Sequence, residues 1–349
     1  MGDSNREIAY FSRMVLVTGS TGLLGSHVLL EVLKREIPVR ALIRPENEEK
    51  EEQLRDLFLW YGPENLILLD RVEWVYGDLL DIPSLEIALQ NVHTVYHCAG
   101  MISFDPAREK KLLRINGEGT RNLVNLCLEL GVSALCHVSS ISVISGNGPI
   151  KSESDDDGPT YSYGYAASKY LAEMEVWRAG QEGLSVAIVN PGVIIGPGSW
   201  SRGSGKLFQE AAKERRFCPP GGTGFIGVSD VAKAMLLLMD KKLFGERFIL
   251  VSQHLTFFEI LGMIANAVGM RPPSKILKRW HLEILWRLDG LRVFFGGKNR
   301  RLTKVAARSL NRSQTYSGEK FNTISGFEFQ KMSEVIYNTA DYFRRQNGI

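Results

Sequence analysis

The sequence predicts an α/β fold in which a doubly wound parallel sheet is followed by a smaller C-terminal lobe. Over residues 14–195, short β-branched apolar runs alternate with longer segments of helical apolar spacing, as in βαβ units whose helices cover both faces of a parallel sheet. Glycine and proline then become dense over residues 197–205 and 218–224, which is typical of loops. We therefore predict one domain over residues 13–195, to which some later segments return, and a smaller lobe made mainly of residues 196–349.

Each expected element is justified by its own apolar pattern. The six strands expected in the first domain are Met14–Thr18, Val39–Ile43, Val72–Tyr76, Thr94–Cys98, Ala134–Ser139 and Ser185–Val189. The helices expected between them are Leu24–Arg35, Pro83–Gln90, Gly117–Leu130 and Tyr165–Gly180. A further surface helix is expected over residues 46–61, where charged residues surround apolar side chains at i, i+3 and i+4. In the smaller lobe we expect helices Asp230–Asp240 and Phe257–Val268 and a strand Arg247–Val251.

The composition excludes several classes of protein. Forty-two lysines and arginines against 39 acidic residues give a formal net charge of +3, far below the basic excess of a nucleic-acid-binding protein. The four cysteines form no C-x-x-C pair, so we expect a reducing compartment and neither a disulfide framework nor a metal site. No apolar run approaches the about 20 residues that span a bilayer, and residues 1–10 are polar and acidic. We expect a soluble cytoplasmic protein.

A glycine-rich loop follows the first expected strand. Gly19, Gly22 and Gly25 have G-x-x-G-x-x-G spacing between that strand and an amphipathic helix. Gly19 would permit the tight turn, Gly22 would let the backbone approach a pyrophosphate, and Gly25 would let helix and strand pack closely. The phosphate would bind the N–H groups at the positive end of the helix dipole, which predicts a dinucleotide-binding Rossmann domain. The loop residues expected at the cofactor are Gly19, Thr21, Gly22, Leu23, Leu24 and Gly25.

The end of the second expected strand bears on the choice of cofactor. An acidic residue there would bind the ribose 2′-hydroxyl of NAD(H), whereas an arginine would favour the 2′-phosphate of NADP(H). This chain has Ile43 where the acid would stand, and Arg44 follows it directly. The sequence therefore favours NADP(H) over NAD(H), although Arg44 as a plain surface cation stays an alternative.

Tyr165 and Lys169 form a Y-x-x-x-K motif at the start of an expected helix. A separation of four residues puts both side chains on one face of that helix. Free tyrosine has a pKa of about 10, and a nearby ammonium that favours the phenolate would let it exchange protons near neutral pH. Tyr161 and Tyr163 lie close by, but neither has a lysine four residues later. We therefore predict that Tyr165 and Lys169 are catalytic.

A pair of serines ends the fifth expected strand. Ligands of parallel sheets bind at the carboxyl ends of the strands, so a hydroxyl at this position would hydrogen-bond a substrate oxygen beside the tyrosine. The 25 residues from Ser140 to Tyr165 allow a loop that brings the next helix back over the sheet. We assign the catalytic role to Ser140. Ser139 stays open, either as a hydroxyl that stabilises the turn or as the catalytic serine in place of Ser140.

These motifs together resemble the extended short-chain dehydrogenase/reductase family. The motifs that occur in family order over about residues 13–240 are the glycine loop, Gly77-Asp78-Leu79, His97-Cys98-Ala99-Gly100, Asn116 with Gly119-Thr120, Val138-Ser139-Ser140, Tyr165 with Lys169, and Pro191-Gly192-Val193. The resemblance implies that Ser140, Tyr165 and Lys169 form a catalytic triad. It also implies cofactor contacts by Asp78 and Leu79 at the adenine, by Cys98, Ala99, Gly100 and Asn116, and by Pro191, Gly192 and Val193 at the nicotinamide. Asp78 as a turn residue and Asn116 as a helix-start hydrogen bonder remain alternatives.

Departures from the family pattern indicate a branch of it. Sugar-nucleotide dehydratases carry an Asp-Glu pair after the catalytic hydroxyl, where this chain has Ile141-Ser142. Sugar-nucleotide epimerases carry polar groups in two later stretches, which here read Val193–Gly196 and Thr223–Asp230 and lack them. The chain is more similar to the dihydroflavonol reductase and 3β-hydroxysteroid dehydrogenase branches.

The resemblance therefore implies an NADP(H)-dependent reductase or dehydrogenase. It would reduce a carbonyl or oxidise a secondary alcohol on a bulky apolar small molecule. Two alternatives stay open: a nucleotide-sugar epimerase that uses the same three residues, and a non-catalytic NADP(H)-binding regulatory protein.

Residues 274–312 mix aromatic with basic side chains, including Trp280, Trp286, Phe294 and Phe295. We expect a helix that covers an apolar pocket, with contact to an anionic membrane surface as the alternative. The resemblance also implies that the helices expected over residues 117–130 and 165–180 would suit the seam of a homodimer, although their apolar stripes would look the same buried in a monomer.

Overall fold

The computed structural model describes residues 14–44, 48–156, 158, 164–295 and 302–349. The polar segment 1–10, the first residues of the helix predicted over 46–61, and Tyr161 and Tyr163 therefore lie outside the described residues.

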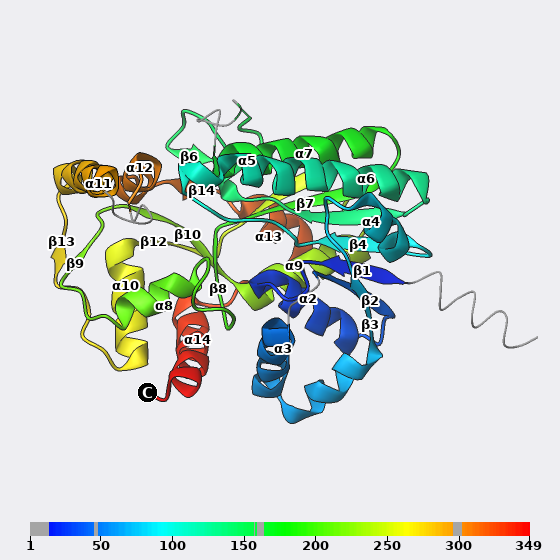
Figure 1. Ribbon diagram of the computed structural model, residues 1–349, viewed down its shortest axis with the longest axis horizontal. Helices are drawn as coiled ribbons and strands as arrows, with labels where there is room; N and C mark the ends of the chain where they lie inside the picture. Colours follow the sequence, from blue (N-terminus) through cyan, green and yellow to red (C-terminus); the bar gives the residue numbers. More distant parts are fainter. Residues whose placement is uncertain (1–13, 45–47, 157, 159–163, 296–301) are drawn as a thin grey trace, which may run out of the picture.

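A parallel sheet of seven strands forms the centre of the molecule (Figure 1). Its strands, in chain order, are β1 Val15–Thr18, β2 Val39–Ile43, β3 Val72–Tyr76, β4 Thr94–His97, β5 Ala134–Val138, β7 Ser185–Pro191 and β11 Glu246–Leu250. Their order across the sheet is β11-β7-β5-β4-β1-β2-β3, and every pair is parallel. The chain thus builds outward in both directions from β1 and β4, which confirms the predicted doubly wound α/β fold.

Helices cover both faces of this sheet, because alternate strand residues point to opposite sides. Val15 and Val17 of β1 pack in one apolar core, and Leu16 packs in the other. The helices over the first core are α2 Leu23–Lys34, α3 Glu48–Tyr61, α9 Val228–Asp240 and α13 Glu319–Ser325, and those over the second are α4 Ile82–Leu89, α6 Gly119–Glu129 and α7 Tyr165–Gln181. Shorter elements of this part are the helical turns η1 Pro63–Arg71, η2 Pro106–Arg108 and η4 Ile141–Val143, α5 Glu109–Leu112, and the paired strands β6 Ile150–Lys151 and β14 Thr315–Tyr316.

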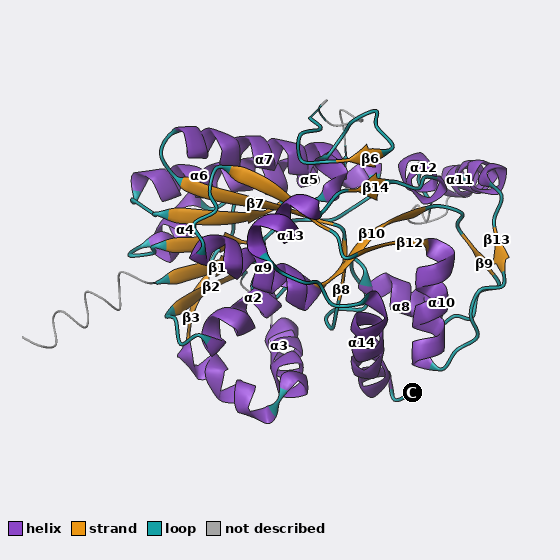
Figure 2. Cartoon of the chain, turned by 180° about the vertical axis from the view of Figure 1, so that it is seen from behind, coloured by secondary structure: helices purple, strands orange, loops and turns teal. Residues whose placement is uncertain are grey.

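A smaller lobe lies beyond the carboxyl ends of the central strands (Figure 2). Its three-stranded sheet has the order β12-β10-β8, with β8 Val193–Ile195, β10 Gly222–Gly227 and β12 Gln253–Thr256. Apolar side chains of this sheet share a core with α8 Gly205–Ala211, α10 Phe257–Val268 and α14 Met332–Asn347. At the outer end of the lobe lie the strand pair β9 Phe217–Cys218 and β13 Lys275–Ile276, then α11 Arg279–Phe294 and α12 Lys304–Asn311.

The expected elements are present, with two informative differences. The strand expected over residues 247–251 is β11, which leaves the smaller lobe and extends the central sheet beside β7. The helix expected to begin at Gly117 is instead preceded by a π-helical turn, η3 Leu113–Glu118, and α6 begins at Gly119. A wider π turn is frequent at functional sites, and this one contains Asn116. Among the described residues, no helix is long and apolar enough to cross a membrane.

Candidate active site

The glycine loop meets the end of β4 at the point where the order of strands reverses. Gly19 has a φ of 67°, and a Cβ on it would lie 2.7 Å from the Cα of Ala99. The loop and the 98–101 segment are therefore in backbone contact, and a larger residue would push them apart. In open parallel sheets this reversal point is where ligands bind.

The start of α2 fits a pyrophosphate. Gly22 is the N-cap of α2. Among the described residues, no side chain caps the free N–H groups in the first turn of this helix. A Cβ on Gly25 would lie 2.1 Å from the carbonyl oxygen of Gly19, so only glycine lets the helix pack this closely on the loop. The uncapped N–H groups at the positive end of a twelve-residue helix are the groups that a bound diphosphate would use.

The ends of β2 and β3 place the residues expected at the adenosine. Arg44 is exposed directly after β2, and Gly77 N donates to the carbonyl of Ile43 at 2.8 Å, so the ends of the two strands adjoin. Asp78 Oδ1 accepts a hydrogen bond from Leu80 N at 2.9 Å, which is the turn role that the sequence left open. Leu79 is buried against Gly119.

Asn116 joins the 98–101 segment to α7. Its carboxamide oxygen accepts from Met101 N at 2.7 Å, and its amide nitrogen donates to Met101 O at 3.0 Å and to Ser168 Oγ at 2.9 Å. Asn116 lies in the π turn, and its side chain is buried. It lies between the 98–101 segment and α7, which flank the predicted cofactor site. A Cβ on Gly100 would lie 3.4 Å from Asn116 Oδ1 and 3.8 Å from Lys169 Nζ, so Gly100 keeps the space beside Lys169 open.

Tyr165 is the first residue of α7, and Lys169 follows one turn later on the same face. Burial raises the pKa of Tyr165 to about 12, against a hydrogen bond from Ser140 that lowers it. Burial also lowers the pKa of Lys169 to about 8, against the charge of Glu173, which raises it. We expected the Lys169 ammonium to lower the pKa of the phenol, and this expectation is wrong here because burial dominates at Tyr165 and the ammonium donates to the carbonyl of Val138 at 2.5 Å.

The two serines at the end of β5 have different partners. Ser139 is buried, and its hydroxyl donates to Glu173 of α7. Ser140 is partly exposed, and its oxygen accepts from Ser142 N at 3.1 Å while its hydroxyl contacts Tyr165. Successive residues of an extended chain point to opposite sides, so one hydroxyl faces the core and the other faces the tyrosine.

The remaining predicted residues border the same region. Cys98 is half-buried after β4, and burial raises the pKa of its thiol to about 12, so it stays protonated. Pro191 ends β7, and a Cβ on Gly192 would lie 2.5 Å from the carbonyl oxygen of Gly224, which shows how closely β7 passes the smaller lobe. Val193 is paired with Phe225 in the parallel ladder between β8 and β10. Phe225 is fully buried in the core of the smaller lobe, so it is core and not a pocket wall.

A family model described as the NAD-dependent epimerase/dehydratase family matches residues 15–250, well over half of the chain. The chain belongs to this family. Members of the family bind NAD(P), and the chain is an enzyme of the extended short-chain dehydrogenase/reductase type with an NAD(P)-dependent oxidoreductase or epimerase/dehydratase activity.

Several relatives of this epimerase/dehydratase chain are similar over much of its length. "Sterol demethylase protein B" from Methylococcus capsulatus is 32% identical over 342 residues, which cover 96% of this chain and 99% of the relative. A "putative dihydroflavonol 4-reductase" from Synechocystis is 30% identical, covering 76% of this chain and 75% of the relative. The crystal structure of gox2253 has a TM-score of 0.76 at 25% identity and covers 96% of this chain and 98% of that one.

Sequence reasoning missed two charged residues of this site. Glu173 lies one turn beyond Lys169, is fully buried, and accepts from Ser139 Oγ, Asn190 Nδ2 and Arg247 Nη1. Arg247 comes from β11. A glutamate four residues after a lysine on a helix is a visible signal, but it suggests a surface pair with that lysine and not a buried pair with an arginine 74 residues away.

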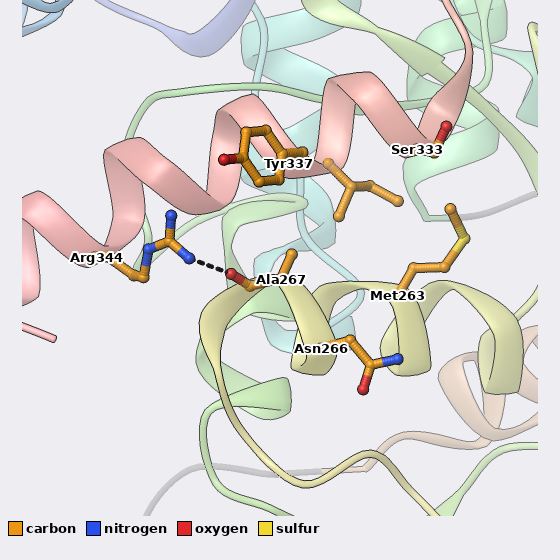
Figure 3. Close-up of a pocket in the computed structure, with 7 residues that line it drawn as sticks. Met263, Asn266, Ala267, Ser333, Tyr337 and Arg344 are labelled. Atoms are coloured by element: carbon orange, nitrogen blue, oxygen red, sulfur yellow. Dashed lines mark hydrogen bonds between the residues drawn. The ribbon is translucent and has the colours of Figure 1, made fainter.

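A surface hollow lies away from these residues, between α10 and α14 (Figure 3). Met263, Asn266 and Tyr337 line it, and Arg344 bridges its two helices by donating to the carbonyl of Ala267 at 2.6 Å. None of the predicted site residues lines it.

Proposed function

We propose that the protein is an NADP(H)-dependent reductase or dehydrogenase that acts on a bulky apolar ketone or secondary alcohol. The observation that carries the proposal is the placement of Tyr165 and Lys169 one turn apart at the start of α7, with Ser140 directly after the carboxyl end of β5. A hydroxyl, a phenol and an ammonium so arranged suit proton exchange with one substrate oxygen.

The proton chemistry follows from the pKa values. A Tyr165 pKa of about 12 keeps the phenol protonated at neutral pH, so the form present is the proton donor needed to reduce a carbonyl. Ser140 Oγ accepts from Ser142 N, so when substrate binds its one hydroxyl hydrogen, which interacts with Tyr165 here, would turn to the substrate oxygen. With a pKa of about 8, Lys169 is mainly charged at neutral pH and would hold the cofactor ribose.

Cofactor binding would use the residues that fit it. The pyrophosphate would contact the loop from Gly19 to Gly25, Arg44 would pair with a 2′-phosphate, and Asp78 would face the adenine. When bound, the nicotinamide supplies the hydride in reduction and accepts it in oxidation. Pro191, Gly192 and Val193, with Ala99, Gly100 and Asn116, would border it.

The substrate class rests on the apolar surroundings of Tyr165. The ring of Phe104 lies 5.9 Å from the ring of Tyr165, and Ile102 and Phe104 are both more than half exposed. Apolar walls gain about 25 cal/mol per Å² of apolar surface removed from water but leave a diphosphate unpaired. The relative named for sterol demethylation is similar over nearly the whole chain, which supports fused-ring apolar substrates.

The test compares two substrate classes on one preparation. Steroidal and aromatic ketones and UDP-sugars are assayed side by side with NADPH and with NADH, following cofactor oxidation and sugar interconversion. We expect oxidation of NADPH with the bulky ketones. Epimerisation of a nucleotide sugar with no ketone reduced would establish the epimerase alternative, and NADPH binding without any turnover would establish the regulatory one.

A further inference from the structure

The outer side of α11 carries an unusually exposed apolar stripe. Its side chains recur every three or four residues, which is one face of a helix. Trp280 and Leu288 are each 55% exposed and Phe294 is 82% exposed, whereas Leu282 on the opposite side is 3% exposed and faces the protein. We call this stripe the α11 face; it consists of Trp280, Ile284, Leu288, Leu291, Phe294 and Phe295. These rings point to solvent, which does not match the pocket cover expected from the sequence.

The stretch of sequence that contains α11 is strongly basic. Residues 271–312 contain twelve lysines and arginines and two acidic residues, a net charge of +10 that leaves −7 for the rest of a chain whose total is +3. Both acidic residues are held in ion pairs on α11, Glu283 with Arg287 at 2.9 Å and Asp289 with Arg292 at 3.0 Å. The exposed cations near the face include Lys275, Lys278, Arg279, Lys304 and Arg308.

We propose that the α11 face binds the surface of an anionic lipid bilayer. An exposed apolar stripe flanked by basic residues, with a tryptophan among its rings, matches the chemistry of a headgroup layer over acyl chains. Anionic headgroups would pair with the cations while the apolar side chains enter the boundary of the acyl chains. A second copy of this chain is a poor occupant, because two such faces would bring two sets of positive charge together.

The α11 face is coupled to the catalytic tyrosine through α12. The helices α11 and α12 pack together, and Asn311 Nδ2 of α12 donates to the carbonyl of Arg279 at 3.2 Å. At the start of α12, Thr303 Oγ1 donates to the carbonyl of Phe104 at 3.1 Å, and Phe104 contacts the ring of Tyr165. A chain of contacts therefore runs from α11 through α12 and Phe104 to Tyr165. This step rests on the proposed function and implies an apolar substrate that is taken from the bilayer.

The binding test uses the full chain and co-sedimentation with vesicles. Wild-type protein is expected to bind vesicles of phosphatidylcholine mixed with phosphatidylserine and to bind pure phosphatidylcholine weakly. Leu288→Ser with Phe294→Ser should reduce binding about tenfold or more, because two inserted side chains are lost. Lys278→Glu with Arg279→Glu should reduce it about fivefold for each charge. All four positions are exposed, so unchanged thermal unfolding is expected and verifies the fold.

The matched control is Ile67→Ser, an equally exposed apolar residue of η1 in the other domain, which should bind like wild type. Equal binding by wild type and the Leu288/Phe294 variant would overturn the proposal. So would sedimentation equilibrium that shows a wild-type dimer dissociated by the same variant, since the face would then belong to a second copy.

A kinetic arm separates this proposal from the proposed function. The Leu288/Phe294 variant should reduce a water-soluble ketone at the wild-type rate and reduce a vesicle-borne steroidal ketone several-fold more slowly. If wild-type protein reduces no ketone, the proposed function is refuted. The vesicle co-sedimentation result still tests whether the α11 face binds a bilayer. Equal loss of both rates in the variant would refute delivery from the bilayer.

Discussion

Glu173 Oε1 and Arg247 Nη1 lie 3.0 Å apart in the buried layer between α7 and the edge strand β11. The same arginine donates to the backbone carbonyls of Glu153 and Asp155, in the segment that precedes Tyr165. Glu173 in turn holds Ser139 beneath Ser140. One buried ion pair thus connects the helix of Tyr165 and Lys169, the end of β5 and the loop before the helix.

Glu173→Gln should destabilise the protein strongly. It leaves the buried Arg247 charge with only the half-exposed Asp156 carboxylate, 4.0 Å away, as a counterion. We expect a cost of about 3 kcal/mol, measured as the free energy of urea-induced unfolding. Glu175→Gln on the same helix is the matched control, since Glu175 pairs with Arg178 near the surface and its loss should cost under about 1 kcal/mol. Because the charge of Glu173 raises the pKa of Lys169, any activity midpoint that reports Lys169 should also shift to lower pH. Equal stabilities of the two variants would contradict a buried pair.

Substitution of Ser140 should mainly lower turnover, whereas substitution of Ser139 should mainly lower stability. Ser140→Ala should lower turnover by about ten- to a hundredfold with little change in stability, because the hydroxyl at Tyr165 is lost. Ser139→Ala should cost about 1–3 kcal/mol of unfolding free energy, because Glu173 loses a buried donor. Turnover and urea unfolding are measured for both variants. A reversed pattern would move the catalytic role to Ser139.

Tyr165→Phe should abolish turnover while leaving NADPH affinity nearly unchanged. The phenol is needed for proton transfer, which contributes about 100- to 10,000-fold. Turnover and NADPH binding are measured on one preparation, with Tyr170→Phe on the same helix as the control that keeps activity. Residual activity within about tenfold of wild type would remove Tyr165 from the role.

Arg44→Ala should weaken NADPH binding selectively. Loss of a charge-assisted hydrogen bond to the 2′-phosphate costs about 1.5–3 kcal/mol, or roughly ten- to a hundredfold in affinity. NADH binding should hardly change, and Arg55→Ala on the exposed side of α3 should change neither. A wild-type protein that prefers NADH, or a variant that loses both cofactors equally, would show another role for Arg44.

The unfolding free energy should fall as the pH drops below about 6.5. Burial lowers the pKa of His97 to about 3 and that of His27 to about 4, and it lowers the pKa of His137 as well. Between the folded and unfolded pKa values the unfolded chain binds more protons, so acidification favours unfolding by about 1.4 kcal/mol per pH unit for each histidine. Above about pH 6.5, the pKa of histidine in the unfolded chain, the histidines are neutral in both states and this loss of stability is absent.

Urea unfolding at about pH 7.5 and about pH 5.5 measures this slope. His27→Gln should reduce it by one histidine's share, and His93→Gln should leave it unchanged because His93 is exposed. A wild-type stability that is flat over this interval would contradict the neutral buried histidines.

Local patterns in the sequence were sufficient for the fold class and for most elements. The alternation of apolar runs with helical spacing predicted the parallel sheet, and the helix over residues 257–268 ends where it was predicted because its cap and apolar spacing are local. The glycine loop and the Tyr165/Lys169 pair were found for the same reason, since each motif lies within one turn or one helix. The catalytic and cofactor roles of these residues stay predictions, as does the choice of NADP(H).

Only the tertiary structure decided which distant elements face one another. The pairing of Glu173 with Arg247 depends on β11 returning to the sheet edge beside β7. The carboxamide of Asn116, which the π turn carries, bonds Met101 in a different segment of the chain. Whether an apolar residue is core or surface is likewise set by its neighbours: Phe225 is buried against the smaller lobe, and Phe294 is exposed on α11. Periodicity shows which side of an element is apolar, but burial depends on what packs there, and that contact joins residues far apart in the chain.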